Sequence, residues 1–120
     1  MNLKVKFRES FRPFAPSCLL EDVTEFFELD EASPYMLLVA PVVEARRCQI
    51  DASESELLGI EKLKKIRSDI PAVTHIDHSA RVQTVDAENN PAYHALIKAF
   101  KECTGSVSYT HLTLPTILRV

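Results

Sequence analysis

The N-terminal stretch of the chain alternates apolar and cationic residues. The apolar set comprises Leu3, Val5 and Phe7, and the cationic set comprises Lys4, Lys6 and Arg8. Because successive side chains of a strand point to opposite faces, this alternation predicts a strand over residues 4–8. The prolines at positions 13 and 16 predict that a stiff turn follows it.

Two interpretations of this cationic face stay open. Like charges next to one another on a strand repel, and solvent tolerates them best at the edge of a sheet. The lysines could therefore serve only to keep an edge strand soluble. Alternatively, the three cations face a polyanion such as a phosphate group, and the pattern alone is compatible with both.

Two further strands and three helices are predicted along the rest of the chain. Residues 35–43 form a continuous apolar run, which indicates a strand covered on both faces. Residues 80–85 alternate, with Arg81 and Gln83 on one face. The order of elements, β-α-β-α-β-α, predicts an α/β domain.

The helices are predicted from their apolar spacing and their caps. Residues 21–29 carry apolar residues at helical spacing, and residues 53–67 follow the capping box Ser53-x-x-Glu56. The third helix begins after Asn90 and ends near Gly105. Its apolar stripe comprises Tyr93, Leu96, Ile97 and Phe100, of which Tyr93 and Phe100 are expected in the core.

Composition narrows the class of protein. The 120 residues are enough for one domain, and 46% of them are hydrophobic, so a core can form. A net charge of −3 argues against a nucleic-acid-binding protein, which normally carries a basic stripe.

Three widely spaced cysteines without a Cys-x-x-Cys pair predict reduced thiols and no zinc site. No signal peptide or membrane-spanning run is apparent, so we expect a cytoplasmic location without membrane contact.

Candidate chemistry is sparse in the pattern itself. His75, Asp77 and His78 could form a base or a metal site, but a loop with surface histidines is the simpler interpretation. Cys18 has no paired histidine in the sequence around it that would activate it as a nucleophile. Arg46-Arg47 is interpreted as a solvated loop. Residues alone therefore predict an α/β domain with a cationic strand suited to phosphate.

Several motifs, in a fixed order, carry a resemblance to a known family. They are Asn2-x-Lys4-Val5-Lys6-Phe7-Arg8-Glu9-x-Phe11-Arg12-Pro13-Phe14-Ala15-Pro16-Ser17, Ser33-Pro34-Tyr35-Met36, Ile70-Pro71-Ala72-Val73-Thr74-His75-x-Asp77, Ser79-Ala80-Arg81-Val82-Gln83-Thr84-Val85 and Asn90-Pro91-x-Tyr93. On these residues the chain resembles the C-terminal domain of the O-carbamoyltransferases, which include the nodulation-factor, cephamycin and tobramycin carbamoyltransferases. The resemblance covers about residues 2–105. It implies a YrdC-like twisted mixed sheet with packed helices.

The resemblance also implies an activity, two substrates and a partner. The YrdC-like domain of this family joins carbamoyl phosphate and ATP into carbamoyl-adenylate, and an N-terminal sugar-kinase-like domain transfers the carbamoyl group to a hydroxyl acceptor. The family's Lys-x-Arg pair before a proline turn matches Lys6 and Arg8, which would bind phosphate. Arg12 and Arg81 are weaker candidates for further phosphate contacts. No catalytic residue is assigned, and no metal ligands are expected in this fragment.

The chain departs from the family pattern in two places. His78 stands where the family usually has glycine. After Gly105 the family continues with a strand that supplies a serine and an asparagine to the phosphate site. Here residues 107–116 instead resemble a translated sequencing-library adaptor. We therefore expect residues 1–105 to be a partial domain, residues 106–120 to be a non-native tail, and the fragment to be inactive alone.

A second hypothesis is a YrdC-like module that binds a nucleotide or RNA without catalysis. The net charge of −3 counts against RNA, since RNA affinity depends on cations that neutralise phosphates. A third hypothesis is an interaction domain whose cationic strand is only a solubilising edge. Binding of ATP and carbamoyl phosphate separates these hypotheses.

Overall fold

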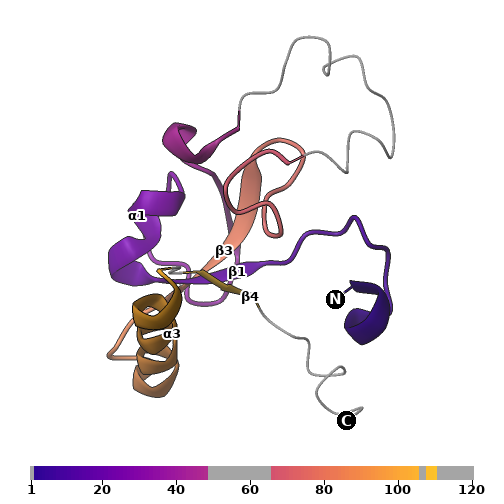
Figure 1. Cartoon of the computed structure of the whole chain (residues 1–120). Coiled ribbons are helices and arrows are strands. Elements are labelled where there is room, and N and C mark those ends of the chain that lie inside the picture. Colours follow the sequence, from indigo (N-terminus) through magenta and orange to yellow (C-terminus); the bar gives the residue numbers. More distant parts are fainter. Residues whose placement is uncertain (1, 49–65, 106–107, 111–120) are drawn as a thin grey trace.

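The computed structural model describes residues 2–48, 66–105 and 108–110 (Figure 1), with the backbone alone for Val5, Lys6 and residues 108–110. Within these residues lies a four-stranded mixed sheet of order β2-β3-β1-β4. The strands are β1 (Pro16–Leu19), β2 (Leu38–Pro41), β3 (Ser79–Val85) and β4 (Ser108–Thr110). β1 is parallel to β3 and antiparallel to β4, and β2 is antiparallel to β3. The mixed α/β class is confirmed.

Alternation along β3 divides the sheet into two chemically different faces. Ala80 and Val82 are buried on one face, which we call the core face. Arg81 and Gln83 point to the opposite face, as predicted from the sequence. Because Val39 is paired with Arg81 across the two strands, it lies on this second face too. We call this second face the site face.

The core face is covered by the segment around α1 (Val23–Phe26), which follows a 3-10 turn at Leu20–Asp22. The buried cluster on this side comprises Cys18, Val23, Phe26, Phe27, Leu29, Ala40, Val42, Ala80 and Val82. The helix is shorter than the predicted span of residues 21–29. It ends because Phe27 adopts an extended backbone and forms an antiparallel bridge with Val42.

Helix α3 (Pro91–Thr104) covers one end of the site face and has the predicted caps. The Asn90 side chain accepts a hydrogen bond from the Tyr93 amide, and Gly105 ends the helix in the left-handed region with φ +72. Ile97 is buried against Leu19 and Val85. These contacts hold the helix on the sheet.

The predicted core position of Phe100 is wrong. Phe100 is 36% exposed and Leu96 is 54% exposed, while Tyr93 is half-buried. The reason is that the buried cluster under this helix is small, with Ile97 packed on Leu19 and Val85, so it buries only part of the apolar stripe. A helical period predicts which residues share a face, but it does not give the width of the surface that covers them.

The strand predicted over residues 4–8 is also wrong. The backbone forms a short π-helix at Asn2–Lys6, and among the described residues no strand lies beside it. Without a neighbouring strand the alternation has nothing to pair with, and Leu3 and Phe7 are 68% and 69% exposed. The amide of Arg8 donates to the carbonyl of Asn2 at 3.0 Å, which folds this N-terminal arm back on itself.

The central strand β1 lies at the end of the stretch that was expected to be a turn. Its four residues are all buried, between β3 on one side and β4 on the other. By contrast, the apolar run at residues 35–43 gives only the short edge strand β2, in which Val39 is exposed and Ala40 is buried. Pro41 is tolerated there because an edge strand needs fewer ladder hydrogen bonds.

The helix predicted over residues 53–67 lies almost entirely outside the described residues. A 3-10 turn at Glu44–Arg46 precedes that part of the chain. β4 lies beyond the domain boundary expected at residue 105, and it pairs with β1 through backbone groups. Since any sequence can form such ladder hydrogen bonds, the boundary stays a prediction.

Burial predicts losses of stability of different size for two phenylalanines that the sequence places on helix core faces. We expect Phe27→Ala to lower the free energy of unfolding by about 3–5 kcal/mol, because its fully buried ring leaves a cavity. Phe100→Ala should cost clearly less, since its ring is partly in solvent. Urea denaturation followed by circular dichroism measures both, and equal losses would contradict the observed packing.

Candidate functional site

The position of Arg8 is set by the folded N-terminal arm. Arg8 donates from Nε to Oδ1 of Asn2 at 2.9 Å and from Nη2 to the carbonyl of Pro13 at 3.1 Å. Its guanidinium also lies over the Phe14 ring, 5.2 Å from the centroid. A guanidinium has five N–H donors, so these contacts orient it and leave further donors for a ligand.

Asn2 is the residue that holds this arm together; the first family motif begins with it, but the sequence assigned it no role. Its Nδ2 donates to the carbonyls of Ser10 and Arg12 at 3.1 and 2.7 Å, and its side chain is buried. The arm is joined to the domain where the amide of Phe14 donates to the carbonyl of Ala72 at 2.8 Å. Asparagine can bridge separate backbone segments in this way because its amide both donates and accepts.

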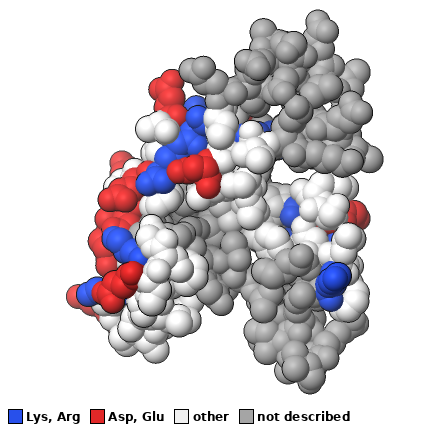
Figure 2. All heavy atoms as spheres, in the orientation of Figure 1, with Lys and Arg blue, Asp and Glu red and all other residues white. Residues whose placement is uncertain are grey.

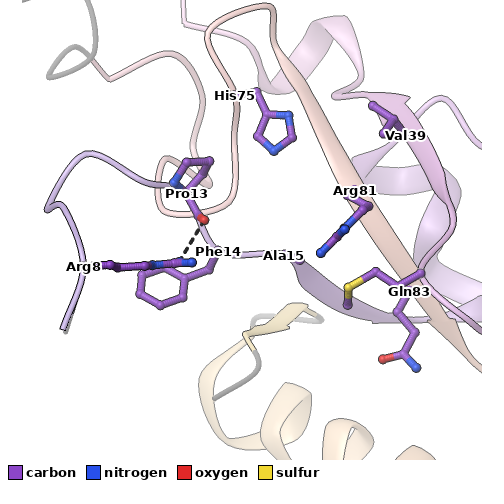
Figure 3. A pocket seen from close by; sticks show the side chains of 9 residues that line it. Arg8, Pro13, Phe14, Ala15, Val39, His75, Arg81 and Gln83 are labelled. Carbon is purple, nitrogen blue, oxygen red and sulfur yellow. Dashed lines mark hydrogen bonds between the residues drawn. The ribbon is translucent and has the colours of Figure 1, made fainter. Parts of the chain in front are cut away.

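The sheet supplies the opposite wall of the site. Arg81 and Gln83 project from the site face of β3, next to the exposed Val39 of β2 (Figure 3). Gln83 is fixed in orientation, because it accepts a hydrogen bond from Ser17 Oγ at 2.8 Å and donates to the carbonyl of Pro34 at 2.9 Å. Arg81 stands beside this fixed amide and is exposed.

These elements enclose a pocket of about 530 Å³, which we call the arginine pocket. Its lining residues are Arg8, Pro13, Phe14, Ala15, Met36, Val39, His75, Arg81 and Gln83. Figure 3 shows Arg8 and Arg81 approaching from opposite sides, with the His75 ring above the space between them. No acidic side chain is among the described residues that line it, so its field favours an anion.

The structure brings two of the four predicted phosphate ligands together. Arg8 and Arg81 share the arginine pocket. Arg12 does not line it: Arg12 pairs with Glu9 at 3.0 Å and belongs to a neighbouring groove of about 1020 Å³. The side chain of Lys6 lies outside the described part of the chain. His75, which the sequence placed on a surface loop, lines both spaces.

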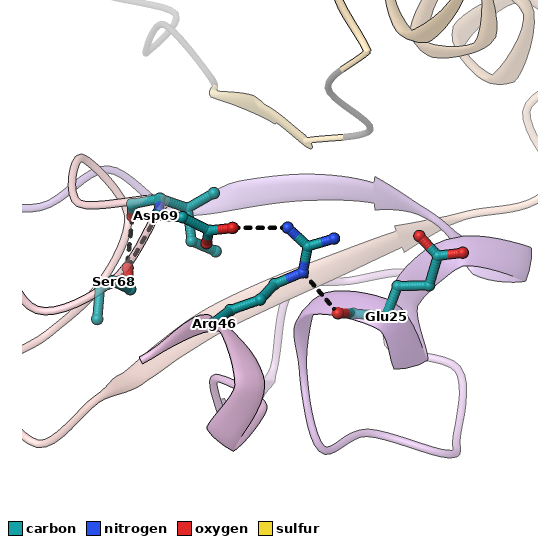
Figure 4. A network of polar contacts seen from close by, with 6 residues as sticks. Glu25, Arg46, Ser68 and Asp69 are labelled. Carbon is teal, nitrogen blue, oxygen red and sulfur yellow. Dashed lines mark hydrogen bonds and ion pairs between the residues drawn. The ribbon is translucent and has the colours of Figure 1, made fainter. Parts of the chain in front are cut away.

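Arg46 and Arg47 are structural clamps, and the solvated-loop interpretation is wrong for them. Arg46 donates from Nε to the Glu25 carbonyl at 2.8 Å and from Nη1 to Asp69 at 2.7 Å (Figure 4). Its guanidinium also lies 3.8 Å from the Phe26 ring centroid. Arg47 donates to the Val42 carbonyl at 2.7 Å. Arginine forms such multiple contacts more readily than lysine because its planar group both stacks and donates.

Acidic side chains gather away from the arginine pocket. Figure 2 shows them along the side of the molecule that carries α1 and α3, mixed with cations. Two pairs tie α3 to the turn before α1, Lys101 with Asp22 at 2.8 Å and His94 with Glu21 at 2.7 Å. This separation explains how a chain of net charge −3 can still hold a cationic pocket.

Cys18 has no catalytic setting. Its thiol is fully buried in the core cluster. Burial, together with the nearby carboxylates Asp22, Glu21 and Glu25, raises the pKa of this thiol to about 12, and burial is the largest cause. A thiol with so high a pKa is not a nucleophile at neutral pH, in agreement with the sequence interpretation.

No group of three or more His, Cys, Asp or Glu side chains in the described part of the chain could hold a metal ion. Among the helices described, none is long and apolar enough to cross a membrane.

Comparison with known proteins identifies the family to which the chain belongs. The model of the family described as carbamoyltransferase C-terminus matches residues 1–110. The chain belongs to the carbamoyltransferase C-terminal family. The match includes both arginines of the arginine pocket, so the pocket lies within the family's domain.

Relatives of this carbamoyltransferase C-terminal chain are much longer than the chain itself. It is 56% identical over 104 residues to an uncharacterized protein of Synechocystis sp., a match covering 87% of the chain and 17% of that relative. It is 43% identical to nodulation protein NolO of Bradyrhizobium diazoefficiens, covering 88% and 16%. It is 38% identical to a 3'-hydroxymethylcephem-O-carbamoyltransferase of Amycolatopsis lactamdurans, covering 85% and 15%. The chain therefore spans about a sixth of the length of these relatives.

The three cysteines should differ sharply in reactivity. Cys48 and Cys103 are exposed and Cys18 is buried. We expect a disulfide reagent at pH 8 to modify two thiols of the native chain rapidly and the third only after unfolding. Absorbance of the released thiolate measures this, and rapid reaction of all three native thiols would contradict the burial of Cys18.

Proposed function

We propose that this chain carries part of the phosphate-binding site of an O-carbamoyltransferase C-terminal domain, with Arg8 and Arg81 as ligands. The observation that supports the proposal is their convergence. One comes from the folded N-terminal arm and the other from β3, and both line the same pocket. A structural salt-bridge role would require acidic partners, and none lines this pocket among the described residues.

The chemistry of the pocket suits a phosphate ester with an attached small group. Guanidinium groups bind phosphate oxygens through two parallel hydrogen bonds, which gives both charge and orientation. Gln83, held by Ser17 and Pro34, offers an amide whose position is fixed next to Arg81. The volume of about 530 Å³ falls in the range of small-molecule sites.

The proposed substrates are carbamoyl phosphate and ATP, which the parent domain would convert into carbamoyl-adenylate. Water would release inorganic phosphate from carbamoyl phosphate, and an oxygen of the resulting carbamate would attack the α-phosphorus of ATP with pyrophosphate as the leaving group. The arginines would neutralise the negative charge that develops on the phosphoryl oxygens as the new bond to phosphorus forms. Lys6, two residues before Arg8 in the sequence, would add a third cation. The carbamoyl group would then pass to a hydroxyl acceptor held by an N-terminal sugar-kinase-like domain of the parent chain, in the cytoplasm.

A pair of arginine variants tests the binding site. We expect Arg81→Ala to weaken binding of carbamoyl phosphate and of ATP by about 10- to 100-fold, because a charged hydrogen-bond partner is lost. Arg12→Ala is the matched control: it removes the same charge close by, outside the arginine pocket, and should change affinity less than about threefold.

Isothermal titration calorimetry at fixed ionic strength measures both dissociation constants. The proposal fails if the two variants lose affinity equally, since that would show only a general effect of net charge. It also fails if Arg81→Ala binds both ligands as the unaltered chain does.

Catalysis by the chain alone is a separate question. The sequence led us to expect an inactive fragment, because the matching family supplies a serine and an asparagine after residue 105. We expect no exchange of labelled pyrophosphate into ATP when the purified chain is mixed with carbamoyl phosphate. Exchange above the background without carbamoyl phosphate would refute the expectation of inactivity.

A further inference from the structure

His75 is held by a short relay of side chains in the turn before β3. The Ser79 hydroxyl donates to Oδ1 of Asp77 at 2.6 Å and lies 3.2 Å from Nδ1 of His75. The Ser79 amide also donates to Asp77 Oδ1 at 3.1 Å, and the His75 amide donates to the Ser79 carbonyl at 2.7 Å. The imidazole is therefore fixed in orientation at the edge of the arginine pocket.

This relay selects one tautomer of the ring. A serine hydroxyl has a single hydrogen, and here it is directed to Asp77. The contact between Ser79 Oγ and Nδ1 can then be a hydrogen bond only if Nδ1 carries a hydrogen and donates it. The hydrogen bond from Ser79 lowers the pKa of the Asp77 carboxyl, so Asp77 is an ionised acceptor at neutral pH and keeps the serine hydrogen.

The tautomer decides what the ring can offer to a ligand. With its hydrogen on Nδ1, a neutral imidazole presents only a lone pair at Nε2. A lone pair repels the oxygens of an anion. The imidazolium form, in contrast, carries a hydrogen on both nitrogens and donates from Nε2. Figure 3 shows the ring projecting into the space between Arg8 and Arg81, where such an anion would lie.

We propose that His75 is the third ligand of the anion in the arginine pocket and that it binds through Nε2 only as the imidazolium. This rests on the proposed function, namely that Arg8 and Arg81 bind a phosphate-like anion. Binding of the anion is then coupled to uptake of one proton by the pocket. The Asp77–Ser79–His75 relay acts by excluding the neutral tautomer that could donate from Nε2 without a proton.

The charged groups around His75 are consistent with this coupling. Arg8 and Arg81 face it across the arginine pocket, and Asp77 lies within its own turn. On its other side, the neighbouring groove brings further cations among the described residues, namely Lys4, Arg12 and Arg67. The hydrogen bond from Ser79 lowers the pKa of Asp77, which keeps this carboxylate ionised at neutral pH. His78 is the other histidine of the turn, and its amide donates to the His75 carbonyl at 3.1 Å.

The test uses sulfate, a dianion that does not titrate between pH 5.5 and 8. Calorimetry on the whole chain should show sulfate affinity falling by about tenfold or more across that range. Titrations in buffers of different ionisation enthalpy should show proton uptake that increases with pH across the range and approaches one proton per sulfate toward pH 8. His75→Gln, whose amide donates at every pH, should bind sulfate with an affinity that changes less than about threefold.

His94→Gln is the control, because His94 lies on α3, pairs with Glu21 and does not line the arginine pocket. It should keep the pH dependence of the unaltered chain. In the unaltered chain, nitrogen NMR of the imidazoles should show His75 protonated at Nδ1 alone at pH 8 and at both nitrogens once sulfate is bound near neutral pH. This second measurement does not require a variant to fold.

The outcomes separate the two proposals. If Arg81→Ala abolishes sulfate binding but His75→Gln is as pH-dependent as the unaltered chain, the role of His75 is overturned and the arginine site stands. A neutral His75 protonated at Nε2 would likewise overturn the role of His75. Absence of sulfate, ATP and carbamoyl phosphate binding by the unaltered chain at every pH would overturn the arginine site itself.

Discussion

The parallel pairing of β1 with β3 is the constraint on which the other features depend. Both strands are largely buried, so their backbone groups must find partners in the sheet. The pairing sets Ser17 opposite Gln83, and the alternation of side chains then assigns every β3 residue to the core or to the site. A shift by one residue would exchange Val82 and Arg81 between the two faces, which the buried cluster around Phe27 does not allow.

The arginine pocket follows from this register and from one contact of the arm. β3 presents Arg81 and the fixed amide of Gln83, while the hydrogen bond between Phe14 and Ala72 brings the arm alongside. Arg8 reaches the pocket because Asn2 folds the arm. Each arginine thus depends on a different contact between distant segments, and the two arginines share the pocket only when both contacts form.

The carboxylates and the cations of the arginine pocket lie in different regions of the described structure. The carboxylates near α1 and α3 are neutralised by clamps such as Lys101 with Asp22 and Arg46 with Asp69. The cations of the arginine pocket are kept away from these carboxylates, so they stay available to a ligand. Exposed ion pairs of this kind contribute little to stability.

The sequence by itself determined the elements with strong local signals, β3 from its alternation and α3 from its Asn90 and Gly105 caps, and its motifs indicated the family. It could not determine β1, because four residues beginning with proline carry no local signal of a central strand. The alternation at residues 4–8 predicted a strand that the arm does not form, because alternation produces a strand only where a neighbouring strand can pair with it. Only the tertiary structure placed His75 with Arg8 and Arg81, since their approach depends on contacts between segments distant in the chain.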